Sequence, residues 1–179
     1  MPRYIITGGP GAGKTTLIEV LNKQGYNCVP EASRALIKEE VLRESTCLPW
    51  ADVSCYTQLA LKRMTDAYDN GADSELIFYD RGIPDLVSYL NLANVPVHTS
   101  ITEALSSYTY NHIAFILPPW REIYRLDAER WQTFKEAELI YSYLVEIYTK
   151  LNFKLITLPK ITANQRAGFI LNILKEKKV

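Results

Sequence analysis

The chain has 179 residues, of which 47% are hydrophobic and 22% are charged, a composition typical of a folded globular protein with its own core. This length favours one domain that spans residues 1–179. Twenty basic residues balance twenty acidic ones, so the formal net charge is zero and the basic surplus typical of nucleic-acid-binding proteins is missing. The charge balance therefore does not indicate a nucleic-acid partner.

In chain order, apolar runs and helical periodicity predict a strand at 4–7, a helix at 15–24, strands at 27–29 and 76–79 with a helix at 49–69 between them, a strand at 113–117, a helix at 134–151, a strand at 153–158 and a helix at 163–175. Strands that alternate with helices predict an α/β fold with a mostly parallel sheet covered on both faces. Ligands are then expected at the carboxyl ends of the strands.

No apolar run approaches the roughly 20 residues of a membrane-spanning helix, and the short apolar stretch 4–6 does not resemble a signal peptide. The three cysteines, Cys28, Cys47 and Cys55, lack the spacing of metal ligands. We expect them to be reduced thiols that pack as small hydrophobic side chains. Together these features predict a cytoplasmic protein.

Residues 8–15 read Gly-Gly-Pro-Gly-Ala-Gly-Lys-Thr and lie directly between a predicted strand and a predicted helix. This matches the P-loop pattern G-x-x-x-x-G-K-[ST], in which glycines let backbone N–H groups point at phosphate oxygens. The following helix adds the positive end of its dipole. Lys14 is expected to reach the β- and γ-phosphates of ATP or GTP, and the Thr15 hydroxyl to ligate Mg²⁺. The residues predicted to hold the nucleotide are Gly9, Pro10, Gly11, Ala12, Gly13, Lys14, Thr15 and Thr16.

Asp80 follows the predicted strand at 76–79 and precedes Arg81. A carboxylate at this end of a buried strand lies beside the P-loop and is suited to bind Mg²⁺ together with Thr15. The alternative is an Asp that caps a helix starting near Pro84. Arg81 stands where ATPase motors carry a Glu, and the sequence contains no guanine-reading N-K-x-D motif and no D-x-x-G switch motif, so hydrolysis as the main reaction is disfavoured.

Three arginines, Arg121, Arg125 and Arg130, follow the strand at 113–117. On a mobile flap they are able to close over the phosphates and neutralise transition-state charge, and Arg121 and Arg125 share a face if the flap is helical. The alternative is a solvated helix held by ion pairs.

Glu31 follows the strand at 27–29 in the segment Pro30-Glu31-Ala32-Ser33-Arg34. A carboxylate there is able to accept the proton of a substrate hydroxyl that attacks the γ-phosphate. It fits the first turn of a helix equally well, because negative charge is favoured there.

With these pieces in place, the chain resembles the small P-loop nucleotide-kinase-like proteins, AAA-domain predicted ATPases grouped with the nicotinamide-riboside kinase domain of NadR. The resemblance is carried by the P-loop, by residues 30–34, by Tyr-Asp-Arg-Gly-Ile-Pro-Asp at 79–85, and by the stretch from Pro119-Trp120 to Glu129-Arg130. It implies a three-layer P-loop fold with a five-stranded parallel sheet of order 2-3-1-4-5 and a helical lid at about 119–132. It also implies that Arg81 serves the substrate or the phosphate.

The sequence thus favours an ATP-dependent phosphotransferase with Mg²⁺, acting on a small hydroxyl-bearing and nucleoside-like acceptor. The site residues that we expect to act in catalysis are Lys14, Glu31, Asp80, Arg81, Arg121, Arg125 and Arg130. The alternative is an ATP- or GTP-binding switch that hydrolyses slowly and recruits a protein or lipid partner. The sequence leaves open whether the nucleotide is ATP or GTP, which compound is the acceptor, and what the oligomeric state is.

Overall fold

The computed structural model describes residues 2–71, 76–125 and 132–176. The strands are β1 (Arg3–Gly8), β2 (Asn27–Val29), β3 (Ile77–Asp80), β4 (Ile113–Leu117) and β5 (Lys154–Thr157). The helices within these ranges are α1 (Lys14–Lys23), α2 (Ser33–Leu42), α3 (Val53–Asp69), α4 (Ile83–Leu92), α5 (Thr99–Ser107), α6 (Phe134–Lys150) and α7 (Ala163–Glu176).

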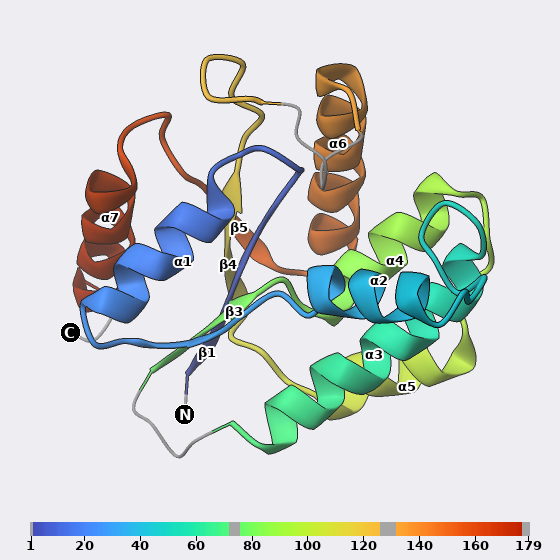
Figure 1. Ribbon diagram of the computed structural model, residues 1–179. Helices are drawn as coiled ribbons and strands as arrows, with labels where there is room; N and C mark the ends of the chain where they lie inside the picture. The colour runs from blue at the N-terminus through green and yellow to red at the C-terminus, as the bar shows by residue number, and fades with distance from the viewer. Residues whose placement is uncertain (1, 72–75, 126–131, 177–179) are drawn as a thin grey trace.

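The five strands form one parallel sheet with the order β2-β3-β1-β4-β5. Ile5 of the central strand lies beside Tyr79 of β3 and Ala114 of β4. Figure 1 shows α1 and α7 on one side of this sheet and α4 and α6 on the other, so the fold has three layers. The predicted α/β class and the strand order 2-3-1-4-5 are confirmed.

The core is divided between the two faces of the sheet because alternate side chains of a strand point in opposite directions. On one face, Ile6 and Phe115 pack with residues of α1 and α7. On the other face, Ile5 and Ala114 pack with residues of α6. Because helices cover both faces, the central parts of β1, β3 and β4 are apolar, and polar residues such as Thr7 and Asp80 lie toward the carboxyl ends of their strands.

Three helices lie outside the elements predicted in chain order: the sequence indicates α2 and α4 only as alternatives near Glu31 and Pro84, and it does not predict α5. All three pack with α3 in a separate apolar cluster beside the sheet. Most residues of α4 are buried, including the polar Asp85 and Ser88. In contrast to α4, the helix α5 is mostly exposed, and its buried residues are Ile101 and Ala104. The predicted helix at 49–69 begins later, at Val53, because the Asp52 side chain accepts a hydrogen bond from the backbone N–H of Cys55 and caps it.

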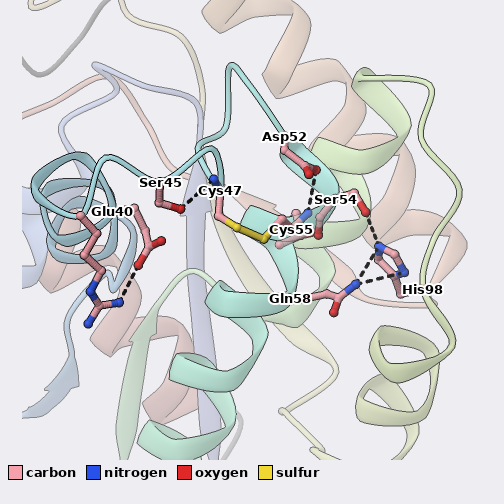
Figure 2. The surroundings of a disulfide bond; sticks show 10 residues. Glu40, Ser45, Cys47, Asp52, Ser54, Cys55, Gln58 and His98 are labelled. Atoms are coloured by element: carbon pink, nitrogen blue, oxygen red, sulfur yellow. Dashed lines mark hydrogen bonds and ion pairs between the residues drawn. A yellow bond between two sulfur atoms is a disulfide. The ribbon is translucent and has the colours of Figure 1, made fainter.

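Cys47 and Cys55 form a disulfide, with their Cα atoms 5.0 Å apart, and only Cys28 is a free thiol. Figure 2 shows Cys47, on the segment after α2, bonded to Cys55 in the first turn of α3. The prediction of three reduced thiols is therefore wrong for two of them. The spacing of eight residues carried no metal or disulfide signature, and it is the fold of the α2–α3 connection that brings the two sulfur atoms together.

Residues 119–125, which together with Gln132 are the described part of the predicted lid, form a turn and no helix. The backbone N–H of Tyr124 donates to the carbonyl of Trp120 at 3.1 Å. Arg121 and Arg125 therefore do not share a helix face, and the expected helical lid is wrong for this part. Residues 126–131, including Arg130, lie outside the described residues.

No helix in the part of the chain that the structure describes combines the length and the apolar character needed to cross a bilayer.

Candidate active site

The P-loop leaves the carboxyl end of β1 and enters α1 through two glycines in the left-handed conformation, Gly11 with φ 73° and Gly13 with φ 87°. A Cβ atom on Gly11 would overlap the ring of Tyr124, and one on Gly13 would come within 3.2 Å of the Arg166 guanidinium. Both positions therefore require glycine for their backbone angle and for their close neighbours. The predicted strand, glycine-rich loop and helix are all present at the predicted place.

Lys14 is buried at the first residue of α1, and its ammonium group lies between two carboxylates. It donates to Oε2 of Glu31 at 3.1 Å and to Oδ1 of Asp80. Glu31 comes from the loop after β2, and Asp80 is the last residue of β3, so three neighbouring segments meet at one point. The structure thus brings together three of the residues that the sequence predicts for the site.

Arg81 is the fourth member of this cluster and is buried beside it. Its Nε donates to Oε1 of Glu31 at 2.7 Å, and its Nη1 donates to Oδ1 of Asp85 at 3.1 Å. Glu31 lies two residues before α2 and accepts bonds from both cations, so the alternative of a residue in the first helical turn is not what the structure has. Nor does Asp80 cap a helix, because the N-cap of α4 is Gly82.

The ionisation of these carboxyl groups follows from burial and from their neighbours. Burial alone would raise the pKa of Glu31, but the positive charges of Arg81 and Lys14 outweigh it and hold that pKa well below its usual range. The pKa of Asp80 is raised, because burial and the charge of Glu31 together exceed the attraction of Lys14. Glu31 is therefore the carboxyl group of the pair that stays ionised over the wider pH range.

A cleft of about 700 Å³ runs over the P-loop. Its wall on the side of α2, α3 and α4 is made by Glu31, Ser33, Ile37, Pro49, Tyr56, Arg81 and Tyr89. Its wall on the side of α7 and the lid is made by Trp120, Ile123, Arg125, Gln132, Ile161, Thr162, Ala163 and Arg166. Figure 1 shows the P-loop end of α1 between these two groups of elements. Residues 9–16 of the P-loop segment line the same cleft, between the two walls.

The predicted nucleotide residues Gly9, Pro10, Gly11, Ala12, Gly13, Lys14, Thr15 and Thr16 all line this cleft. Of Arg121 and Arg125, the two described arginines predicted for the lid, Arg125 lines it as well. The guanidinium of Arg121 instead lies over the ring of Phe134, 4.9 Å from its centroid. Arg121 is therefore held at the start of α6 and not among the lining residues.

Two buried side chains of the site have no assigned role in the sequence analysis. Asp85 comes four residues after Arg81, in the first turn of α4, and is fully buried. Arg166 of α7 donates from Nη1 to the carbonyl of Ala12 and from Nε to the carbonyl of Pro159, both at 2.8 Å. The one available signal for Arg166 is a charge on the apolar face of α7, beside the buried Ala167 and Ile170.

The described residues contain no group of three or more His, Cys, Asp or Glu side chains that could hold a metal on its own. Mg²⁺ in phosphate-transfer sites is usually bound by only one or two protein ligands together with phosphate oxygens. The Thr15 hydroxyl, on the exposed surface of the cleft, and the Asp80 carboxylate beside the P-loop match that donor set.

A family model described as an AAA domain matches residues 3–166. No curated protein matches the chain in sequence. Among solved structures, deoxyadenosine kinase from M. mycoides is 16% identical and covers 97% of this chain and 99% of its own, with a TM-score of 0.65. Thymidylate kinase from Candida albicans is 15% identical over 99% and 92% of the two chains, with a TM-score of 0.65.

NadR in complex with NR is 15% identical, with a TM-score of 0.64, and the match covers 98% of this chain and 51% of that one. At these identities the structures share a fold with this chain. They are all P-loop kinase-like folds, which confirms the family resemblance carried by the motifs.

Proposed function

The chain belongs to this AAA-domain family, and from that premise we propose that it is a phosphotransferase which moves the γ-phosphate of ATP or GTP to a small hydroxyl-bearing, nucleoside-like acceptor. The observation that carries the proposal is the double ion pair of Glu31 with Lys14 and Arg81 in the cleft wall. A carboxylate on the acceptor side of a phosphate-binding lysine is the arrangement that a kinase needs. The kinase-like folds of the solved neighbours support the same reaction class.

On the nucleotide side, the triphosphate would lie over the P-loop, with Lys14 at its β- and γ-phosphates. Thr15 and Asp80 would bind Mg²⁺, which neutralises phosphate charge when it is present. The adenine or guanine ring of the nucleotide would lie toward Trp120 and residues 161–163, at the α7 end of the cleft. This placement leaves the wall formed by α2, α3 and α4 for the acceptor.

On the acceptor side, Glu31 would receive the proton of the attacking hydroxyl group. The acceptor oxygen bonds to the γ-phosphorus, the bond from that phosphorus to the bridging oxygen breaks, and the proton passes to Oε of Glu31. The low pKa of Glu31 keeps it ionised before the reaction. Moving Lys14 toward the phosphates would remove one cation from Glu31 and make it a better proton acceptor.

The walls near Glu31 favour an acceptor with a flat, apolar part. Tyr56 and Tyr89 line the cleft on the same wall as Arg81, together with Ile37 and Pro49. Aromatic rings of this kind suit a heterocyclic base or another planar group. Arg125 and the predicted Arg130 would act from the lid.

One observation favours the alternative of a nucleotide-binding switch. The ring of Tyr124 lies so close to Gly11 that a methyl group at that position would overlap it. A conformational change of the P-loop on nucleotide binding would therefore displace Tyr124 and the segment 120–124. A switch protein transmits its nucleotide state by such a displacement.

The two readings separate in a transfer assay. The purified protein is incubated with γ-labelled ATP or GTP, Mg²⁺ and a panel of nucleosides and sugars, with Lys14→Ala as the inactive control. A kinase gives a labelled product from at least one acceptor, and Lys14→Ala gives none. Slow, acceptor-independent release of phosphate with no labelled product from any acceptor would overturn the kinase proposal in favour of the switch.

A further inference from the structure

Asp85, at the third residue of α4, is fully buried and accepts four hydrogen bonds. Its Oδ1 accepts from the Thr7 hydroxyl at 2.6 Å and from Nη1 of Arg81 at 3.1 Å. Its Oδ2 accepts from the Gly82 backbone N–H at 3.0 Å and from the Tyr148 hydroxyl at 2.6 Å. These donors come from β1, from the turn after β3 and from α6, so three elements converge on one carboxylate.

Helix capping alone does not account for this arrangement. The bond from Gly82 is the usual one between the third residue of a helix and its N-cap, and it is normally made at a solvent-exposed helix end. Here the carboxylate has no exposure, and a buried charge is costly unless it is paired and hydrogen-bonded. The charge that pairs with it is the Arg81 guanidinium. The ion pair with Arg81 therefore explains why a charged side chain is buried at this position.

Arg81 itself is held in an unusual conformation. It is a non-glycine residue with φ 74°, a region that larger side chains adopt only when the surroundings impose it. Its backbone N–H donates to the carbonyl of Ile6 at 3.0 Å, and the next N–H donates to Asp85. The turn is thus fixed from β1 and from α4, and it directs the Arg81 side chain to the cleft wall.

We infer that Asp85 is a positioning residue that holds the Arg81 guanidinium in register with Glu31. The guanidinium meets carboxylates on two different edges, with Nε toward Glu31 and Nη1 toward Asp85. With one hydrogen bond, the planar guanidinium could still rotate about the axis of that hydrogen bond. Two hydrogen bonds, one on each edge, fix both the plane and the direction of the guanidinium. The inference rests on the proposed function insofar as Glu31 is the proton acceptor for the transferred phosphate.

The other groups that face Arg81 leave this role to Asp85. The ring of Tyr89 lies 5.7 Å from the guanidinium carbon and supports it from one face without fixing its rotation. Tyr148 and Thr7 reach Arg81 only through Asp85, to which both donate. Since Thr7 directly precedes Gly8 at the start of the P-loop segment, Asp85 also ties the orientation of Arg81 to the strand that carries the P-loop.

A double-mutant cycle separates positioning from general stabilisation. Asp85→Asn should lower kcat by about 10²-fold, the scale of a small misplacement, with the nucleotide KM nearly unchanged. If Asp85 acts through Arg81, the double variant Asp85→Asn/Arg81→Met should be no slower than Arg81→Met alone. Multiplied effects would overturn the inference. Ser88→Ala is the matched control, because it removes a buried hydrogen bond within α4, from the Ser88 hydroxyl to the Pro84 carbonyl, that does not involve Asp85.

A measurement that needs no activity distinguishes failure of this inference from failure of the proposed function. Nitrogen-15 NMR of the wild-type side chain, assigned by its loss in Arg81→Lys, should show a slowly exchanging Nε–H and separate Nη signals, because two carboxylates restrict rotation. Asp85→Asn should average the Nη signals and leave the Nε–H in place, and Ser88→Ala should change neither. Averaged Nη signals in the wild type would overturn the inference even if Asp85→Asn does not fold.

Discussion

The guanidinium of Arg81 donates from Nε to Oε1 of Glu31 at 2.7 Å, across fifty positions of the sequence. This bond joins the loop after β2 to the end of β3, the two neighbouring strands on one side of the P-loop strand. With Lys14 on the other carboxylate oxygen, Glu31 is fixed by cations from two directions. The wall that we propose for the acceptor therefore has its charged groups paired without any ligand.

Glu31→Gln should lower the rate of phosphate transfer by about 10²- to 10⁴-fold, the contribution of a general base. Nucleotide affinity should be retained, because the amide removes the charge but leaves Lys14 and the P-loop in place. Initial rates together with nucleotide binding measure both quantities. Glu39→Gln is the control, since Glu39 lies on α2 and pairs with the partly exposed Arg63 away from the cleft. A Glu31→Gln variant with normal turnover would remove the proposed base.

The stability of the protein should fall with acid in a way that depends on Glu31. Its pKa is lower in the folded protein, because Arg81 and Lys14 outweigh the effect of burial. Its contribution to the free energy of unfolding is therefore complete above the unfolded pKa of roughly 4.3 and is lost as the pH falls below that value. Urea unfolding between pH 6 and pH 3 should show a smaller decline for Glu31→Gln than for the wild type. Parallel declines would contradict the assigned pKa direction.

Gly11→Ala should weaken nucleotide binding and destabilise the fold by about 1–2 kcal/mol, the cost of a left-handed non-glycine residue. The added methyl group would also overlap the ring of Tyr124. Gly168→Ala in α7 is the opposite case, because nothing lies within 4 Å of the added atom and the glycine is helical. That control should raise stability by about 0.5–1 kcal/mol. Thermal unfolding of both variants measures the contrast, and equal shifts would contradict it.

Removing the Cys47–Cys55 disulfide should lower stability by about 2–3 kcal/mol, the chain-entropy value for a loop of this length. Cys47→Ser/Cys55→Ser and the wild type under a dithiol reductant should unfold at the same denaturant concentration, and the oxidised wild type at a higher one. Thiol counting on the unfolded, unreduced protein should find one group, from Cys28. Three thiols would show that the disulfide does not form.

Local pattern was enough to predict the P-loop, because its glycines, Lys14 and Thr15 are adjacent in sequence and sit between a strand and a helix. The same holds for the end of β3 at Asp80. Glu31 had two interpretations, because nothing near it in sequence says that Lys14 and Arg81 reach it. That information lies in the strand order.

Features that depend on distant partners escaped the sequence analysis for the same reason. Asp85 looks like an ordinary helix-start residue until Tyr148 is brought to it from α6. Arg166 gains its role from the carbonyl of Ala12, which is 154 positions away. The lid residues Arg121 and Arg125 were read with a helical period, but Trp120 and Tyr124 close a turn there instead.

Calorimetric titration with ATP and with GTP, each with Mg²⁺, tests the claim on which the whole account stands, that Lys14 binds the phosphates of a nucleoside triphosphate. Wild type should bind one of the two with a dissociation constant on the order of 1 μM to 1 mM, the usual range for enzyme substrates. Lys14→Ala should lose that binding, while Lys23→Ala, exposed at the far end of the same helix, should keep it. No binding of either nucleotide by the wild type, or unchanged binding by Lys14→Ala, would contradict the account.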